Sequence, residues 1–218
     1  MVAKSLKRSI FVVSAAGALA LAPPASASHQ YRDSVRCAGK TVRNVQVLEQ
    51  TSEATAFRKR FPTRPYATYA SYACMRRAGS IERLKGSEYS LSRVRPQLAG
   101  RYVAFRRLDE LNEFGSASGI VILNMLTGAI VYESPRDGVA YMLRFVVKRN
   151  GSAAWFDSPQ EEPGIRVYKI DATTAGNRQL LSSFTQVTQR DVESLILLPD
   201  RRQILWTEND EPKSAPID

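Results

Sequence analysis

The chain has 218 residues, of which 31 are Lys or Arg and 21 are Asp or Glu, so its formal net charge is +10. This length suits one domain with a real core. Two cysteines and a single histidine cannot form a closed four-ligand zinc centre without carboxylates, which excludes the common Cys and His zinc sites. No apolar run after the first 27 residues approaches the 18 residues of a membrane-spanning helix.

The first 27 residues have the pattern of a secretory signal peptide. A charged region with Lys4, Lys7 and Arg8 precedes a mostly apolar run over 10–22, and Ala25-Ser26-Ala27 supplies the small residues of a cleavage site. An uncleaved membrane anchor is the alternative for this pattern. Twin arginines and a following cysteine are both absent, so we expect Sec-type export without lipid attachment. Cleavage would leave residues 28–218 as a single secreted or extracytoplasmic domain with a net charge of +7.

Both cysteines, Cys37 and Cys74, lie in the exported part of the chain. In an oxidising compartment an even pair is most simply one disulfide. By restricting the unfolded chain, this bond would stabilise the fold by about 3–4 kcal/mol.

A strand pattern recurs with a period near 50 residues. LAGRYVAFRRLDE, KRNGSAAWFDSPQ and LPDRRQILWTEND each contain a turn, an apolar strand and an acidic segment. Val103, Ala154 and Leu205 are 51 residues apart, and Ala104, Trp155 and Trp206 share this register, so each set is expected in equivalent surroundings. Such a period indicates a repeat architecture.

Each repeat contains four predicted strands. The apolar segments YMLRFVV and VESLILL precede the shared turn and strand, and strand–turn–strand segments such as SGIVILNMLTGAIVYE follow it. The sequence therefore predicts an all-β, antiparallel, propeller-like fan of three to four four-stranded blades, at about 41–86, 93–134, 140–184 and 193–217. Because the last blade has only two clear strands, either residues 28–40 complete it or the fan is open, with strand edges able to pair with another chain.

The segment LILLPDRRQILWTEND resembles the repeat of TolB-type, WD-repeat-like β-propellers. FVVKRNGSAAWFDS is a weaker copy, with Asn150-Gly151 where Pro-Asp-Gly is expected, and the resemblance covers about residues 41–217. The chain also resembles small exported bacterial propeller-like proteins. The Trp-Asp dipeptide and the Gly-His of true WD repeats are absent. The resemblance implies a propeller-like fold and no particular activity, because propellers have many functions.

The sequence lacks the common catalytic motifs. GSASG, at 115–119, has Ala117 where a nucleophile elbow needs serine. The only histidine, His29, adjoins the expected cleavage site, where chain ends are usually poorly ordered. Neither GxxxxGK[ST] nor GxGxxG after a strand occurs. We therefore expect a non-catalytic protein.

Loop carboxylates keep one enzymatic alternative open. Glycosidases need two facing acids about 5–9 Å apart. Two groups of acids in the sequence have suitable spacing: Asp109, Glu110 and Glu113, and Asp157, Glu161 and Glu162. The alternative function is thus a divergent hydrolase that uses loop carboxylates.

Charge separates by position within the predicted blades. If the strands of a blade are named A to D, the A–B and C–D turns share one face, and the other connections share the opposite face. The first face is the candidate anion-binding face, with Arg76, Arg77, Arg101, Lys148, Arg149, Arg178, Arg201 and Arg202. The second face collects 13 of the 21 acids and is the candidate cation-binding face, with Asp109, Glu110, Asp157, Glu161, Glu208 and Asp210 as its main candidates.

These faces predict an exported interaction module. The basic face would bind an anionic envelope component or a protein partner. The acidic face offers the oxygen ligands that Ca²⁺ prefers, and Ca²⁺ is the only cofactor that the sequence leaves open. Repeats that copy their turn residues would also place charge periodically without any partner. A nucleic-acid partner is not expected, because the basic excess is modest and no aromatic-lined basic groove can be inferred.

Overall fold

A computed structural model describes residues 32–61, 68–85, 95–111, 115–134, 140–159, 164–172, 177–186 and 188–218. The predicted signal peptide, His29, Glu113, Glu161 and Glu162 lie outside these residues. Asp109 and Glu110 are described only as backbone positions of a strand.

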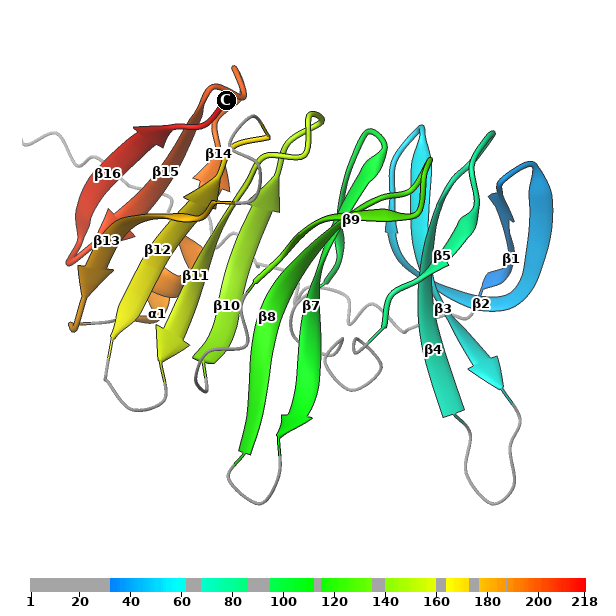
Figure 1. The fold of residues 1–218 in the computed structure, drawn as a ribbon, viewed down its shortest axis with the longest axis horizontal. Helices are drawn as coiled ribbons and strands as arrows, with labels where there is room; N and C mark the ends of the chain where they lie inside the picture. Colours follow the sequence, from blue (N-terminus) through cyan, green and yellow to red (C-terminus); the bar gives the residue numbers. More distant parts are fainter. Residues whose placement is uncertain are drawn as a thin grey trace, which may run out of the picture. The chain divides into compact units, whose positions relative to one another are not determined.

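The described residues form four antiparallel sheets (Figure 1). The first sheet has the order β1-β2-β3-β4-β5, with β1 Arg32–Cys37, β2 Lys40–Gln50, β3 Ala54–Phe61, β4 Thr68–Met75 and β5 Ile81–Arg83. The second has β6 Gln97–Ala99, β7 Tyr102–Leu111, β8 Gly115–Asn124 and β9 Ala129–Glu133. The third has β10 Ala140–Val147, β11 Ala153–Pro159, β12 Ile165–Ile170 and β13 Gln179–Phe184. The fourth has β14 Ile196–Leu197, β15 Gln203–Glu208 and β16 Glu211–Pro216, preceded by the short helix α1, Gln189–Glu193.

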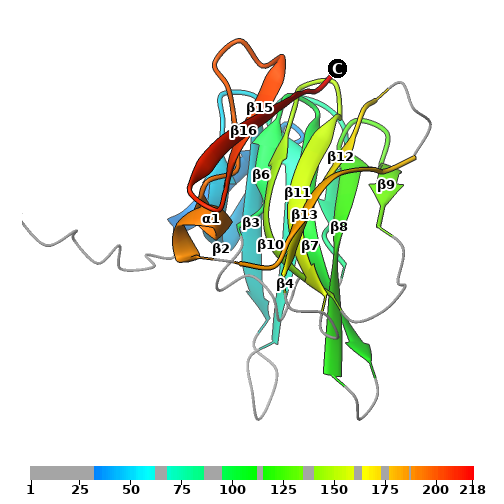
Figure 2. The same cartoon turned by 90° about the vertical axis from the view of Figure 1, so that its left-hand side faces the viewer.

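The sheets follow one another in a row in sequence order, with their faces packed together (Figures 1 and 2). A hydrophobic core fills each of the three gaps. One core joins the first and second sheets, another joins the second and third, and another joins the third and fourth. Within the described part of the chain, no core cluster or strand ladder joins the first sheet to the fourth.

A middle sheet is buried on both faces, which explains the unbroken apolar run at the start of β11. Ala153 and Trp155 face the second sheet, while Ala154 and Phe156 face the fourth. All four are buried. Strands covered on both sides have continuous rather than alternating apolar sequence.

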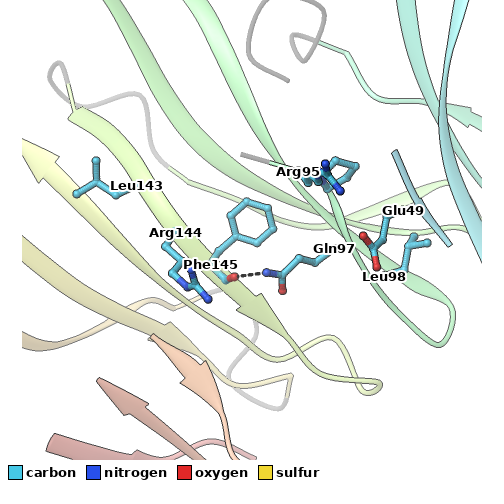
Figure 3. Close-up of a pocket in the computed structure, with 8 residues that line it drawn as sticks. Glu49, Arg95, Gln97, Leu98, Leu143, Arg144 and Phe145 are labelled. Atoms are coloured by element: carbon cyan, nitrogen blue, oxygen red, sulfur yellow. Dashed lines mark hydrogen bonds between the residues drawn. The ribbon is translucent and has the colours of Figure 1, made fainter. Parts of the chain in front are cut away.

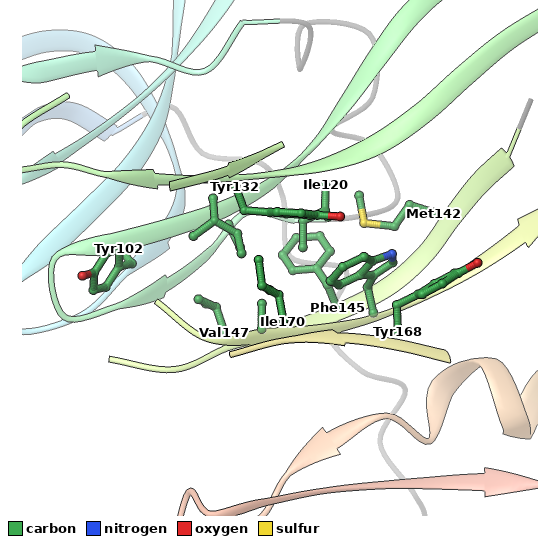
Figure 4. Close-up of a cluster of buried hydrophobic side chains, with 12 residues drawn as sticks. Tyr102, Ile120, Tyr132, Met142, Phe145, Val147, Tyr168 and Ile170 are labelled. Carbon is green, nitrogen blue, oxygen red and sulfur yellow. The ribbon is translucent and has the colours of Figure 1, made fainter. Parts of the chain in front are cut away.

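Aromatic rings dominate the core between the second and third sheets (Figure 4). The ring of Trp155 lies between those of Tyr132 and Tyr168, with centroid separations of 5.4 and 5.6 Å. Such ring contacts stabilise a core beyond the contribution of its buried apolar area. The core therefore fixes β9, β11 and β12 relative to one another.

The outer face of the first sheet is covered by its own first hairpin. A fourth core cluster of Val35, Cys37, Val45, Phe57 and Cys74 lies there. The predicted disulfide between Cys37 and Cys74 is confirmed, and it joins β1 to β4, which are not neighbours in the sheet. Because β1 pairs with β2, the alternative in which residues 28–40 complete the last sheet is wrong for the residues described.

The expected equivalence of Ala104, Trp155 and Trp206 is only partly right. Trp155 and Trp206 each face the preceding sheet, whereas Ala104 faces the following one. Phe105 faces the preceding sheet in its place. The cause is turn length: two residues separate β6 from β7, but five separate β10 from β11. A shift by an odd number of residues turns a strand's side chains to the opposite face.

The predicted strand VESLILL is also only partly right. Helix α1 takes its first two residues, and only Ile196–Leu197 are strand. Thr188 caps the helix: its hydroxyl accepts a hydrogen bond from Asp191 N, and the Asp191 carboxylate accepts one from Thr188 N. This reciprocal capping box outweighs the strand preference of the flanking residues.

The all-β, antiparallel prediction is confirmed, and four sheets of three to five strands are compatible with a propeller-like fan. Among the helices of the described residues, none has the length and apolar character needed to cross a bilayer.

Candidate anion-binding site

Turns from all four sheets lie along the same edge of the row, which we call the turn end (top of Figure 1). Arg149, after β10, forms an ion pair with Glu53, which precedes β3. A Cβ on Gly100, between β6 and β7, would lie 3.4 Å from Nε of Arg149. Lys148 Nζ donates to the carbonyl of Ile217, just after β16. The predicted basic residues therefore belong to neighbouring turns.

Two of the eight predicted basic residues lie against aromatic rings. The Arg101 guanidinium is 5.2 Å from the ring centroid of Tyr102 and also donates to its hydroxyl. The Arg178 guanidinium is 4.9 Å from the ring centroid of Tyr168. Stacking leaves the positive charge in place but fixes the direction of the side chain.

Two other predicted basic residues, Lys148 and Arg149, already form polar contacts within the protein. Lys148 donates to the Ile217 carbonyl at 2.6 Å. The Arg149 guanidinium is paired with the Glu53 carboxylate. These two residues are therefore weaker candidates for ligand contacts than the sequence suggests, because a ligand would have to displace existing interactions.

Arg76 and Arg77, by contrast, line a hollow of about 450 Å³ at the turn end of the first sheet. Arg36, Gly39 and Ser52 complete its lining, and we call it the arginine hollow. Arg36 and Arg77 are exposed, and Arg76 is half-buried. Three arginine residues from two separate segments therefore line one space.

Three turns form the walls of the arginine hollow. Ala38 and Gly39 have φ angles of 49° and 74°, as a two-residue type I′ hairpin turn requires. Ser52 lies in the turn that Thr51 organises by accepting hydrogen bonds from the backbone N–H groups of Glu53 and Ala54. Arg76 and Arg77 follow β4 directly.

Backbone bonds and the disulfide fasten these turns together. Ala38 N donates to the Met75 carbonyl at 2.8 Å, and Gly39 N donates to the Arg76 carbonyl at 3.2 Å. Arg76 N donates to the Glu53 carbonyl at 2.8 Å. The disulfide lies immediately before the first two contacts, with its Cα atoms 5.7 Å apart. The hollow is therefore formed by the fold itself and needs no ligand to assemble it.

Sequence reasoning missed Arg36, Gly39 and Ser52. Arg36 lies inside β1, on a strand that the repeat pattern did not include, so it could not be assigned to either face. Its proximity to Arg76 and Arg77 follows from the curled first sheet and the disulfide. The cysteine pair was the available signal, because residues next to bonded cysteines are neighbours in space.

The last two predicted basic residues, Arg201 and Arg202, lie exposed in the β14–β15 turn. Arg202 N donates to the Asp200 side chain at 3.0 Å, which orders this turn. They extend the basic character of the turn end to the fourth sheet.

The predicted acidic residues do not gather into one site in the described residues. Glu208 accepts a hydrogen bond from the Ser182 hydroxyl at 2.6 Å, and Asp210 is 3.7 Å from Arg190. Asp157 lies on β11. Across the described part of the chain, no three His, Cys, Asp or Glu side chains form a group that could hold a metal ion.

Asp157 is the carboxylate whose surroundings most change its chemistry. Burial raises its pKa to about 6, against the opposing effect of Arg166 and Arg178. One of its carboxylate oxygens is buried and has no hydrogen-bond partner among the described residues. No second carboxylate of the described residues is among the groups that shift its pKa, and Glu161 and Glu162, its partners in the predicted two-acid group, lie outside those residues.

A second hollow, of about 390 Å³, is lined by residues of β2, β6 and β10, which belong to the first three sheets (Figure 3). Glu49, Arg95 and Arg144 supply its charges. Gln97 Nε2 donates to the Phe145 carbonyl at 2.6 Å, and Arg144 Nε donates to the Leu195 carbonyl at 2.9 Å. Its polar groups thus join neighbouring sheets, and an acid offsets part of its positive charge.

Comparisons with protein-family models, curated proteins and solved structures find no match to this chain. The resemblance to TolB-type and WD-repeat-like propellers therefore stays a prediction from the quoted segments.

Proposed function

We propose that this chain is a non-catalytic interaction module that binds an anionic partner through its turn end. The partner suggested by predicted export is a component of the cell envelope with repeated negative charge. A surface of one sign attracts such a partner over about one Debye length, roughly 8 Å at physiological salt.

The observation that carries this proposal is the distribution of unpaired positive charge. Five arginines at the turn end form no ion pair with any described carboxylate side chain: Arg36, Arg76, Arg77, Arg201 and Arg202. The turn-end acid Glu53 is already paired with Arg149. A surface that neutralised its own charge would offer nothing to an anion, whereas this one keeps its arginines accessible.

The hydrolase alternative depends on carboxylates at the other end of the sheets. Joint replacement of Asp109, Asp157 and Glu208 by their amides separates the two functions. A binding module retains polyanion binding in this variant, whereas a hydrolase loses turnover.

Charge reversal tests the proposal directly. We expect the chain to bind long-chain polyphosphate and poly-glutamate, more weakly as salt increases. Arg201→Glu with Arg202→Glu should weaken binding about tenfold, because two attractions become repulsions. The matched control is Arg60→Glu with Lys85→Glu, which makes the same change of net charge on exposed residues outside the turn end, near the far end of β3 and after β5. Equal losses in the two variants would overturn the proposal, because net charge alone would then account for binding.

A further inference from the structure

We propose that the arginine hollow is a site for one phosphoryl group. This inference rests on the proposed function and names the ligand chemistry of one part of that surface. The ligand is a phosphomonoester, whether a small soluble one or the headgroup of a lipid.

Charge and donor geometry favour a phosphoryl group over a carboxylate. Arg36, Arg76 and Arg77 bring three positive charges to one hollow, and no acid is among its lining residues. A phosphomonoester carries close to two negative charges at pH 7 and three terminal acceptor oxygens. A carboxylate has one charge and two oxygens, so it would leave at least one guanidinium unmatched. Planar guanidinium groups also bind phosphate with two parallel hydrogen bonds each.

The size of the hollow indicates more than a bare ion. Its volume of about 450 Å³ is within the range of small-molecule sites, which run from roughly 300 to 1,000 Å³. Ser52 and Gly39 add an exposed hydroxyl-bearing residue and an open glycine to the lining. The organic part of an ester would occupy the space that the phosphoryl group leaves.

The site is held ready by the fold. The disulfide and the backbone bonds from Ala38, Gly39 and Arg76 fix the turns that carry the arginines. A site formed before binding avoids the entropy cost of ordering loops around the ligand.

Arg149 is a positioning residue for this site. Its guanidinium forms an ion pair with the carboxylate of Glu53. Glu53 directly follows the lining residue Ser52, and its backbone carbonyl accepts a hydrogen bond from Arg76 N. If Arg149 were absent, this acid would be free to pair with the arginines of the hollow. The ion pair therefore keeps a competing intramolecular anion away from the ligand.

The test is titration of the full exported chain with inorganic phosphate, glycerol phosphate and acetate, with binding measured by NMR or calorimetry. We expect both phosphates to bind, with acetate at least tenfold weaker. Arg36→Gln and Arg76→Gln should each weaken phosphate binding about tenfold, while Arg60→Gln, on an exposed residue near the far end of β3, leaves it unchanged. If the half-buried Arg76 variant does not fold, the exposed Arg77→Gln serves in its place.

Arg149→Gln should weaken phosphate binding several-fold, and adding Glu53→Gln should restore it. A merely structural role for Arg149 would give no such rescue, and absence of rescue would overturn its positioning role. Vesicles containing phosphatidic acid distinguish the sources of the phosphoryl group. Vesicle binding that needs the same arginines identifies a lipid headgroup, and phosphate binding without vesicle binding identifies a soluble ester.

The outcomes separate this inference from the proposed function. Polyphosphate and poly-glutamate binding without any binding of the two small phosphates would overturn the phosphoryl site and leave the proposed function intact. Equal affinity for acetate would do the same. Loss of binding to every anion would overturn both.

Discussion

At the scale of single residues, Asp157 makes stability depend on pH in an unusual direction. Burial raises its pKa from 3.8 to about 6. The folded chain therefore binds the proton more tightly than the unfolded chain does. The associated stability is fully present below about pH 4 and is lost as the pH rises to about 6.

We accordingly expect Asp157→Asn to stabilise the protein at pH 7.5 by about 1–3 kcal/mol, because the amide is neutral at every pH. At pH 3.5 the two proteins should be similar in stability. Urea unfolding across this range measures the difference. A constant offset between the variant and the parent at all pH values would contradict the assignment.

Two glycines with positive φ, Gly79 and Gly39, allow the cost of backbone strain to be measured apart from the cost of a steric clash. Gly79 has φ +83°, and a Cβ there would lie 2.7 Å from the Met125 carbonyl oxygen. Gly39 has φ +74°, but a Cβ there would meet only the Arg77 carbonyl, at 4.0 Å. The two sites thus share the strain of a left-handed residue and differ in crowding.

We expect Gly39→Ala to cost about 1 kcal/mol of unfolding free energy, from backbone strain alone. Gly79→Ala should cost about 2–3 kcal/mol, because the first and second sheets must also move apart at this turn. Thermal or urea unfolding of the matched pair isolates the contact. Equal losses of unfolding free energy in the two variants would show that the Gly79 and Met125 turns move apart without cost.

At the scale of elements, a group of polar contacts fastens β16 to the third sheet. Lys169 Nζ lies 2.8 Å from the Asp171 carboxylate and donates to the Pro216 carbonyl at 3.0 Å. The same carboxylate accepts a hydrogen bond from Asp218 N, and the Ser152 hydroxyl donates to the Asp218 carbonyl. Lys169 is only 8% exposed, so these partners replace the water that would otherwise solvate its ammonium group.

We predict that Lys169→Met destabilises the protein by about 2–4 kcal/mol, because it leaves the Asp171 carboxylate without its buried countercharge. Asp171→Asn in the same background should recover more than about 1 kcal/mol, since the neutral amide needs no countercharge. A double-mutant cycle by urea unfolding gives this coupling. Strictly additive losses of unfolding free energy would show that Lys169 and Asp171 do not stabilise the fold through their ion pair.

At the scale of the whole molecule, the two ends of the row are finished differently. The first sheet covers its outer face with its own β1–β2 hairpin. In the fourth sheet, β16 is the last strand. Ile217 N donates to the Arg202 carbonyl, so by alternation the N–H positions of Pro212, Ser214 and Pro216 point away from β15. Prolines have no N–H, so this edge offers few donors to another strand.

Replacing both prolines should therefore promote self-association. Pro212→Thr with Pro216→Thr restores two outward donors and raises β propensity. We expect larger species with increasing concentration in sedimentation velocity, compared with the parent. Pro199→Thr, in an exposed turn, is the control. An unchanged sedimentation profile for the double variant would mean that the prolines do not protect the edge.

The accuracy of the sequence predictions depended on how local each signal was. Turn and strand patterns are local, and they predicted the all-β antiparallel class and the regions of most strands. The predicted orientation of the Ala104 side chain was wrong because the β6–β7 turn is three residues shorter than the β10–β11 turn. The TQRD segment at 188–191 had the pattern of a capping box, so helix α1 was readable from the sequence although the expected strand overlooked it.

The sequence by itself determined the disulfide pair, the sheet-forming segments and the basic character of the turns, because cysteine number, apolar runs and turn residues act over a few positions. Only the tertiary structure decided which arginines of the turn end form no ion pair with a described carboxylate. Arg149 pairs with Glu53 across 96 residues of sequence, and Arg36 lines the same hollow as Arg76 only because the first sheet curls over itself. Charge pairing depends on distance in space, which period and composition alone do not specify.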